Sequence, residues 1–311
     1  MPKYQNKNAV LVKVETTYGT DAVPTGAANA VLLVDEPEIV PLDMSTVDRK
    51  LIREYFGNSE QLPTGVFARI NLKCEIAGAG AAGTAPAWGP LLRGCGFSET
   101  VTAGTKVEYK PVTGNPEGVS IYANKDGLLH KLTGARGSVK LNFAVDDIPR
   151  FEFSFIGLFN PVTDGAMPAT TLTAWKTPLP VNKANTPTFA LHGYAAPLQS
   201  LSLDMGNQND FYSLPNAAES ILFSGRQPKG SVSMEAVSIA AKDWFTTIKN
   251  VTLDTMQLIH GTVAGNKVQI DAPKVQINSP KYGGYKNALM LNGDLALMPN
   301  AGNDELVITA L

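Results

Sequence analysis

The residues that could take part in chemistry are few and scattered. One stretch, Gly78-Ala79-Gly80-Ala81-Ala82-Gly83, spells the G-x-G-x-x-G pattern of dinucleotide-binding loops. In such a site the glycines open directly into a helix, whose N-terminus binds the pyrophosphate. Here residues 84–86 intervene, and the strand pattern before the glycines alternates, whereas a central parallel strand would be apolar throughout. We therefore interpret the stretch as a flexible joint.

No group of titratable residues has the spacing of a metal or catalytic site. The three histidines, His130, His192 and His260, match no H-E-x-x-H or related ligand pattern. The acidic pairs Asp35-Glu36 and Asp146-Asp147 fall at expected turns, where solvated carboxylates are common. The G-x-S-x-G nucleophile motif is also missing from the sequence. We therefore expect a protein that is not an enzyme, with no catalytic residue, no metal and no other cofactor.

The cysteines and the polar opening of the chain indicate a reducing compartment. Two cysteines, Cys74 and Cys95, are too few for a disulfide framework. The apolar run at residues 9–12 is too short for the core of a signal peptide. We expect two buried, reduced thiols in a protein made in a cytosol. Because no stretch approaches about 20 apolar residues, we expect no contact with a membrane.

The overall composition argues against a basic nucleic-acid binder. The chain has 311 residues, of which 44% are hydrophobic, enough for a sizeable core. Its 26 basic residues are balanced by 28 acidic ones, giving a net charge of −2. Since binding to phosphates needs clustered Lys and Arg, we expect no specific binding of nucleic acid.

Alternation of apolar and polar residues dominates the sequence and predicts β-strands. It is clearest at residues 69–76, where every even-numbered residue is apolar. Residues 138–145 and 151–155 show the same pattern and are expected to pair. Residues 119–123 and 128–132 flank an Asp-Gly pair, which is a strong hairpin signal because Gly accepts a positive φ.

Helical patterns are limited to two short segments, residues 88–95 and 240–249. Each contains a tryptophan, Trp88 in the first and Trp244 in the second. We expect each tryptophan to be a structural anchor that packs its helix on the outer or lateral side of a sheet. The two helices fall at corresponding places in the order of elements.

That order repeats: a strand, a long polar segment, a Pro-x-Gly, an alternating strand, a tryptophan helix and further strands occur twice. The predicted fold is mainly β, with two tandem β-sandwich or barrel modules, each with one short flanking α-helix. The expected divisions are an N-terminal arm (1–30), a first module (31–161), a linker (162–197) and a second module (198–311). The alternative is one large β domain whose turns recur at similar spacing.

Four stretches resemble the major tail proteins, or tail tube proteins, of phages and prophages with long non-contractile tails. They are VKVETTYGTDAVPTG (12–26), APAWGPLLR (85–93), HKLTGARG (130–137) and PNAGNDEL (299–306). The resemblance implies modules of the tail-tube type, whose sheets join in stacked rings around a lumen. Many members carry one module and form hexameric rings, so two modules imply trimeric rings with pseudo-sixfold symmetry. Hexameric rings of this chain are the alternative.

The resemblance also implies a function and partners. The protein would be a structural virion protein of the tail, assembled in the host cytoplasm. Its tube would be the conduit first for the tape-measure protein and then for DNA, which passes without specific binding. Its other partners would be the tail terminator and distal tail proteins. A β-sandwich binding or adhesin module is the alternative function.

Two long polar segments, residues 43–62 and 204–227, are predicted to be assembly loops. About twenty residues without periodicity inside a compact domain are unusual and often functional. Aromatic and arginine residues are enriched at protein interfaces. The candidate contact residues of these types are Arg49, Arg53, Tyr55, Phe56, Phe211 and Tyr212.

Overall fold

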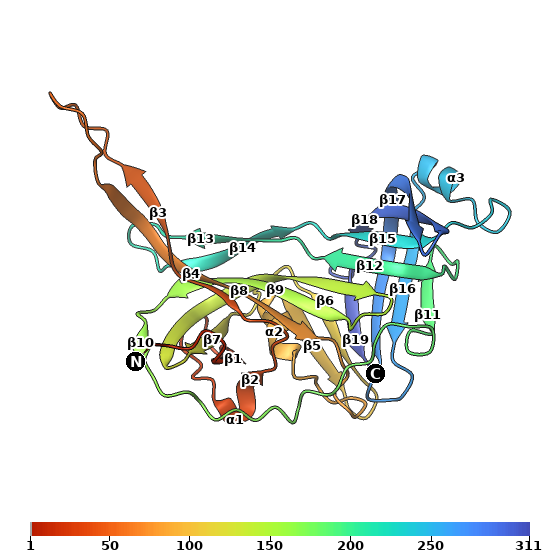
Figure 1. Cartoon of the computed structure of the whole chain (residues 1–311), viewed down its shortest axis with the longest axis horizontal. Helices are drawn as coiled ribbons and strands as arrows, with labels where there is room; N and C mark the ends of the chain where they lie inside the picture. The colour runs from red at the N-terminus through yellow and green to blue at the C-terminus, as the bar shows by residue number, and fades with distance from the viewer. Residues whose placement is uncertain (1) are drawn as a thin grey trace.

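The computed structural model describes residues 2–311 and consists mostly of antiparallel strands (Figure 1). Seventeen strands belong to one hydrogen-bonded network, and β13 and β14 form a separate pair. The expected mainly β class is confirmed, with three short helices among the described residues. None of these helices is long and apolar enough to cross a membrane.

The first half of the chain forms an antiparallel series of strands in the spatial order β3, β4, β9, β8, β7, β1. We call it the first series. Its strands are β1 (Asn8–Val14), β3 (Glu38–Asp48), β4 (Gln61–Glu75), β7 (Val119–Lys125), β8 (Leu128–Ala144) and β9 (Arg150–Phe159). Strand β1 lies in the segment expected to be an arm, and it pairs with β7 along its whole length.

The second half forms another antiparallel series in the order β12, β15, β18, β17, β16, β11. We call it the second series. Its strands are β11 (Thr188–Leu191), β12 (Leu198–Asp204), β15 (Lys229–Glu235), β16 (Asp254–His260), β17 (Val268–Tyr285) and β18 (Ala288–Met298). Each series thus visits its strands in the same order, and a short helix follows β4 in one and β15 in the other. These helices are α2 (Gly89–Gly94) and α3 (Trp244–Lys249).

The remaining elements are short and flank the two series. Strand β2 pairs with β1, β10 with the start of β8, β19 with the start of β17 and with β6, and β5 with β6. They are α1 (Gly26–Asn29), β2 (Ala30–Val31), β5 (Phe97–Thr102), β6 (Lys106–Pro111), β10 (Thr163–Asp164) and β19 (Val307–Ala310).

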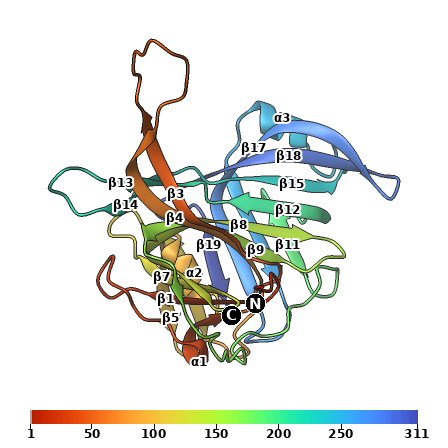
Figure 2. The ribbon, with the colours of Figure 1, turned by 60° about the vertical axis from the view of Figure 1, so that its left-hand side comes forward.

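The two series join edge to edge within the chain. Strand β8 is longer than β7, and its free part pairs with β12, placing Leu141 opposite Leu203. Eight strands therefore follow one another without a break: β3, β4, β9, β8, β12, β15, β18 and β17. Figure 2 shows β8, β12, β15 and β18 side by side. One hydrophobic core cluster contains residues of both series.

Residues 162–197, the expected linker, run along the first series before entering the second as β11 (Figure 1). The Nε1 of Trp175 anchors this segment by donating a hydrogen bond to the Ala30 carbonyl at 2.9 Å. Several prolines lie along it, which suits an extended path.

The glycine-rich stretch is not the flexible joint that we expected. The Gly80 N–H donates to the Gly265 carbonyl at 2.7 Å, and a Cβ on Gly78 would lie 2.3 Å from that oxygen. A Cβ on Gly83 would similarly meet the Gly104 nitrogen at 2.3 Å. Gly78 and Gly80 therefore allow close backbone contact between the two halves, and Gly83 allows it within the first half. A residue with a side chain would prevent these contacts.

The two segments expected to be loops are largely β-hairpins. Strands β3 and β4 continue past Val40 as a paired ribbon that projects from the body, leaving only residues 49–60 as a loop (Figures 1 and 2). Strands β13 (Asn207–Tyr212) and β14 (Ser220–Arg226) form the second hairpin. The β3–β4 ribbon is exposed on both faces, so its sequence carries no alternation that would have predicted strands.

Candidate assembly interface

The projecting β3–β4 hairpin presents a group of exposed apolar side chains. Ile52 and Phe56 are fully exposed at its tip. The group comprises Leu42, Met44, Val47, Leu51, Ile52, Tyr55, Phe56 and Leu62. Exposed apolar residues gathered in this way are typical of interaction surfaces, so this group is the candidate assembly surface. Two of the predicted contact residues, Tyr55 and Phe56, belong to this group.

Two more predicted residues, Arg49 and Arg53, organise the same tip. Arg49 forms an ion pair with Glu60 across the end of the hairpin. The guanidinium of Arg53 lies 5.8 Å from the centre of the Tyr55 ring. Both arginines are exposed, so these contacts add little to the stability of the free subunit. They leave cationic and aromatic groups together at the tip.

The second hairpin is docked on the first series through its strands, and its turn extends beyond the body (Figure 2). Phe211 and Ile221 pack with Phe67 and Ile156, and the Phe67 and Phe211 ring centres are 5.3 Å apart. Tyr212 is half-buried. In Figure 1 this hairpin lies above β8 and β9, which it also contacts. The structure therefore separates the predicted contact residues into a free group on β3–β4 and a partly covered pair, Phe211 and Tyr212.

Two side chains of the first series hold the backbone of the docked hairpin at Ile221. The Tyr18 hydroxyl accepts a hydrogen bond from the Ile221 N–H at 2.6 Å and donates to the Gly134 carbonyl at 3.0 Å. The Arg136 guanidinium donates to the Ile221 carbonyl at 2.7 Å and lies 4.3 Å from the Tyr18 ring centre. Burial raises the pKa of Tyr18, so the hydroxyl stays protonated.

The buried carboxylate of Glu15 positions the backbone near Tyr18 and Arg136. Glu15 accepts hydrogen bonds from the N–H groups of Gly19 and Gly134, both at 2.7 Å, and from the Ser120 hydroxyl at 2.8 Å. Gly134 has a φ of +56°, and a Cβ there would lie 2.9 Å from the Tyr18 ring. Glycine is therefore required at position 134 by both conformation and space.

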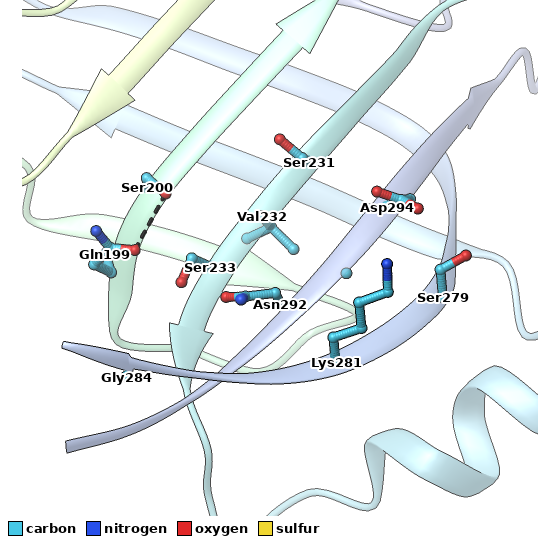
Figure 3. Close-up of a pocket in the computed structure, with 11 residues that line it drawn as sticks. Gln199, Ser200, Ser231, Val232, Ser233, Ser279, Lys281, Gly284, Asn292 and Asp294 are labelled. Carbon is cyan, nitrogen blue, oxygen red and sulfur yellow. Dashed lines mark hydrogen bonds between the residues drawn. The ribbon is translucent and has the colours of Figure 1, made fainter. Parts of the chain in front are cut away.

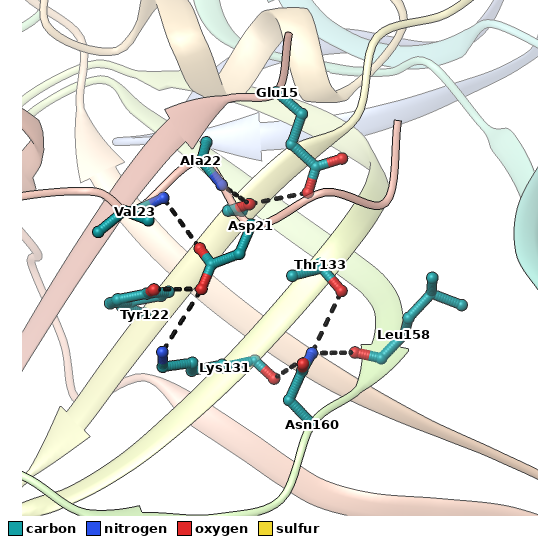
Figure 4. A network of polar contacts seen from close by, with 10 residues as sticks. Glu15, Asp21, Ala22, Val23, Tyr122, Lys131, Thr133, Leu158 and Asn160 are labelled. Carbon is teal, nitrogen blue, oxygen red and sulfur yellow. Dashed lines mark hydrogen bonds and ion pairs between the residues drawn. The ribbon is translucent and has the colours of Figure 1, made fainter. Parts of the chain in front are cut away.

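A second polar group lies beside the first (Figure 4). Asp21 accepts hydrogen bonds from the Tyr122 hydroxyl and the Lys131 ammonium, and Asn160 donates to the Thr133 hydroxyl at 3.2 Å. These residues tie the loop after β1 to β7, β8 and the end of β9. Sequence reasoning did not select Glu15, Tyr18 or Arg136. The sequence signal that could have identified them is their position in stretches 12–26 and 130–137, which resemble tail tube proteins.

The stretch 299–306 anchors the other end of the docked hairpin. Glu305 is buried and forms an ion pair with Arg226, the last residue of β14. Arg226 also donates to the Val112 carbonyl at 2.7 Å and to the Asn303 side chain at 2.6 Å. Losing either partner of this pair would leave a buried charge without compensation.

Both predicted anchor tryptophans are buried, in different surroundings. Trp88 lies in the main core against Tyr109 and Phe151, and its Nε1 donates to the Ala77 carbonyl at 2.8 Å. Trp244 packs near His192 and Tyr194, and within residues 2–311 its Nε1 has no hydrogen-bond partner. Their role as anchors stays a prediction.

The histidines and cysteines are placed as structural groups. Burial lowers the pKa of His192 and of His260, and the latter contacts the Thr186 hydroxyl at 2.9 Å and the Leu179 carbonyl at 3.0 Å. Burial raises the pKa of both Cys74 and Cys95, which keeps them as thiols. In residues 2–311 no three His, Cys, Asp or Glu side chains gather closely enough to hold a metal ion.

One hollow of about 340 Å³ lies over β12, β15, β17 and β18 (Figure 3). It is lined mainly by hydroxyl, amide and charged groups, among them Ser200, Ser231, Ser233, Lys281, Asn292 and Asp294. No histidine is among the described residues that line it. Its groups suit a hydrated surface.

The chain was compared with known protein families and with curated proteins. The model of the phage tail tube protein family matches residues 5–287 of the chain. No curated protein matches it.

Proposed function

Because the chain belongs to the phage tail tube protein family, which is structural and is found in the virion tail, we propose that its subunits polymerise into stacked rings. This function replaces the binding or adhesin module considered from the sequence. The exposed apolar group on the β3–β4 hairpin supports the proposal, since it requires a covering partner. A tube made of identical subunits supplies such a partner at every position.

We further propose that each chain contributes two tube modules to a ring of three chains. The observation that carries this is the identical order of strands in the first and second series. In this proposal β1 belongs with the first module (31–161), and β11 belongs with the second (198–311). Each module would supply four strands of the eight-strand run, so three chains would supply 24 strands.

The polar face of this run is suited to a lumen that passes the tape-measure protein and then DNA. On neighbouring strands Lys140 lies opposite Glu152 and Asp204, so positive charges have negative neighbours. Such a face does not attract phosphates strongly, which permits DNA to slide through. The tail terminator and distal tail proteins would then contact the two ends of the tube.

Electron microscopy of the purified full-length chain tests this function. We expect tubes, with threefold symmetry in each ring. Six chains in each ring would overturn the two-module assignment while leaving the tube intact. A protein that stays monomeric at high concentration would overturn self-assembly itself.

A further inference from the structure

We propose that subunits in a ring are joined by antiparallel pairing of β3 in one chain with the end of β17 in the next, with Ile39 opposite Tyr282. This inference rests on the proposed function and specifies its subunit contact. The pairing would repeat, between chains, the junction that β12 and β8 form within one chain. Each ring would then contain the same kind of strand junction both within chains, between β8 and β12, and between chains, between β17 and β3.

The junction within the chain provides the template. Leu203 of β12 lies opposite Leu141 of β8, and both side chains are fully buried. One residue away, on the polar face, the Ser202 hydroxyl donates to the Asn142 side chain at 2.8 Å. The contact therefore combines a buried apolar row with a hydrogen-bonded polar row.

The equivalence of the two series fixes the register at β17. In the first series Cys74, Phe151 and Leu141 lie opposite one another across β4, β9 and β8. Cys74 lies one residue before the end of β4, as Met234 does in β15, so the matching row of the second series contains Met234, Leu291 and Tyr282. Tyr282 thus occupies the position of Leu141.

The register at β3 follows from a second pair of rows. Ile39 of β3 lies opposite Ile70 of β4, and Ile70 precedes Cys74 by four residues. Leu203 of β12 lies opposite Gly230 of β15, and Gly230 precedes Met234 by four residues. Ile39 therefore occupies the position of Leu203, which places it opposite Tyr282.

The two edges are free in the isolated subunit. Within the described residues β3 pairs only with β4, and β17 beyond Val275 pairs only with β18. Tyr282 is 62% exposed although its counterpart Leu141 is fully buried. The strand paired with β8 at Leu141 is β12, so the strand missing beside Tyr282 is the equivalent of β12. In a neighbouring chain that strand is β3.

The backbone groups at both positions point toward these free edges. The Ile76 N–H bonds to the Pro149 carbonyl of the β9 side, so even-numbered residues of β4 face β9 and odd-numbered residues face β3. Glu38 and Val40 therefore face β4, and Ile39 faces away from it. The same alternation in β18 directs the backbone groups of Tyr282 outward.

The projecting hairpin extends the same contact. In the chain β12 continues into the β13–β14 hairpin, whose Phe211 and Ile221 cover Ile156 of β9. The matching positions on the β3–β4 hairpin are Val47 and Leu62, which are 55% and 49% exposed.

The matching surface of the second series is open. Ala296 of β18 corresponds to Ile156, and it lines a hollow of about 620 Å³ beside Pro228 and Pro299. The β3–β4 hairpin of the neighbouring chain would fill this hollow and cover Ala296, in the same way that β13–β14 covers Ile156 within one chain.

Disulfide trapping tests the register. We would combine Glu38→Cys with Gly283→Cys, the pair that corresponds to Ser202 and Asn142. Facing Cys residues at a non-hydrogen-bonded pair have the short Cβ separation that a disulfide needs. The native Cys74 and Cys95 are buried with raised pKa values, so they should not interfere.

We expect oxidised tubes of this variant to give covalent trimers on a denaturing gel, with no cross-link in free subunits. Ser202→Cys with Asn142→Cys is the positive control and should close within each monomer. Glu38→Cys with Lys281→Cys is shifted by two residues and should cross-link at least about tenfold less. Tubes that yield only monomers, or more product from the shifted pair, would overturn the proposed register.

A second variant covers the case in which the cysteine pair disturbs folding. Tyr282→Asp should raise the concentration needed for polymerisation at least about tenfold, because the new charge would be buried without a partner. Leu289→Asp, at an exposed residue of β18, is the matched control and should polymerise normally. Equal behaviour of the two would contradict the inference. Failure of the wild-type chain to form tubes would instead overturn the proposed function.

Discussion

Tyr18 and Arg136 come from separate parts of the first half and meet at one residue of the second, Ile221. This contact between the first series and the β13–β14 hairpin depends on single side chains. Polar residues can replace water at a backbone group and so fix the position of a hairpin without a large apolar area. Their contribution should therefore be measurable by conservative substitution.

We predict that Tyr18→Phe loosens the β13–β14 hairpin. The substitution removes the acceptor of the Ile221 N–H and should lower the free energy of unfolding by about 1–3 kcal/mol. Hydrogen exchange should increase at residues 207–226. Tyr122→Phe, which also removes a bonded hydroxyl, is the control and should leave exchange in this hairpin unchanged. Equal exchange in both variants would contradict the role of Tyr18.

The buried histidines predict a pH dependence of stability. Burial lowers the pKa of His192 and His260 below the ordinary 6.5, so the unfolded chain binds protons that the folded chain does not. Stability should be greatest above about pH 6.5 and should fall as the pH decreases below it. The Tm of His192→Asn with His260→Gln should decrease less than that of the wild type between about pH 7.5 and 5.5. An unchanged slope would assign the acid sensitivity to other groups.

At the scale of elements, alternation in the sequence predicted the buried strands and failed where strands are solvated on both faces. The predicted runs 69–76 and 138–145 lie in β4 and β8, apart from the last residue of each run, because one face of each strand is buried. The β3–β4 ribbon was predicted to be a loop because neither face is buried in the single subunit. The glycines 78–83 were misread because close backbone contact leaves the same sequence pattern as flexibility.

We predict that Ile52→Ser with Phe56→Ser abolishes polymerisation while leaving the Tm of the subunit within about 1 °C. Both side chains are fully exposed, so their removal should not affect the fold. Val263→Ser, at another exposed apolar residue, serves as the control for a general loss of surface hydrophobicity. Light scattering and thermal denaturation would measure the two effects. Normal tubes from the double variant would exclude the hairpin tip from assembly.

Substitutions of the two helix tryptophans should lower the Tm of the subunit, unlike substitutions at the hairpin tip. Truncating a buried Trp to Ala typically costs about 3–5 kcal/mol, so Trp88→Ala and Trp244→Ala should both lower the Tm. Trp88→Ala should have the larger effect, because Trp88 also loses its hydrogen bond to Ala77. If Trp244→Ala left the Tm unchanged but abolished polymerisation, Trp244 would be a subunit-contact residue and not a structural anchor.

For the whole molecule, the repeated order of elements was visible in the sequence, but the join between its halves was not. Strand pairing between distant segments depends on which edges remain free, and residues 200–204 and 140–144 carry no local signal of their contact. The hydrogen bonds of Tyr18 and Arg136 with Ile221 could not be predicted for the same reason, since they depend on three distant segments of the chain coming together. Family resemblance supplied the function that such local patterns could not.

The prolines beside Ile39 have a consequence for how a tube begins. Of residues 37, 39 and 41, only Ile39 has a backbone N–H, because the other two are prolines. A single neighbour is therefore held weakly at this edge, which protects free subunits from random association. Growth should need a nucleus that also engages the hairpin, so polymerisation should show a lag phase that preformed tube fragments abolish. Pro37→Ala with Pro41→Ala should shorten the lag in light-scattering traces, and an unchanged lag would locate the kinetic barrier elsewhere.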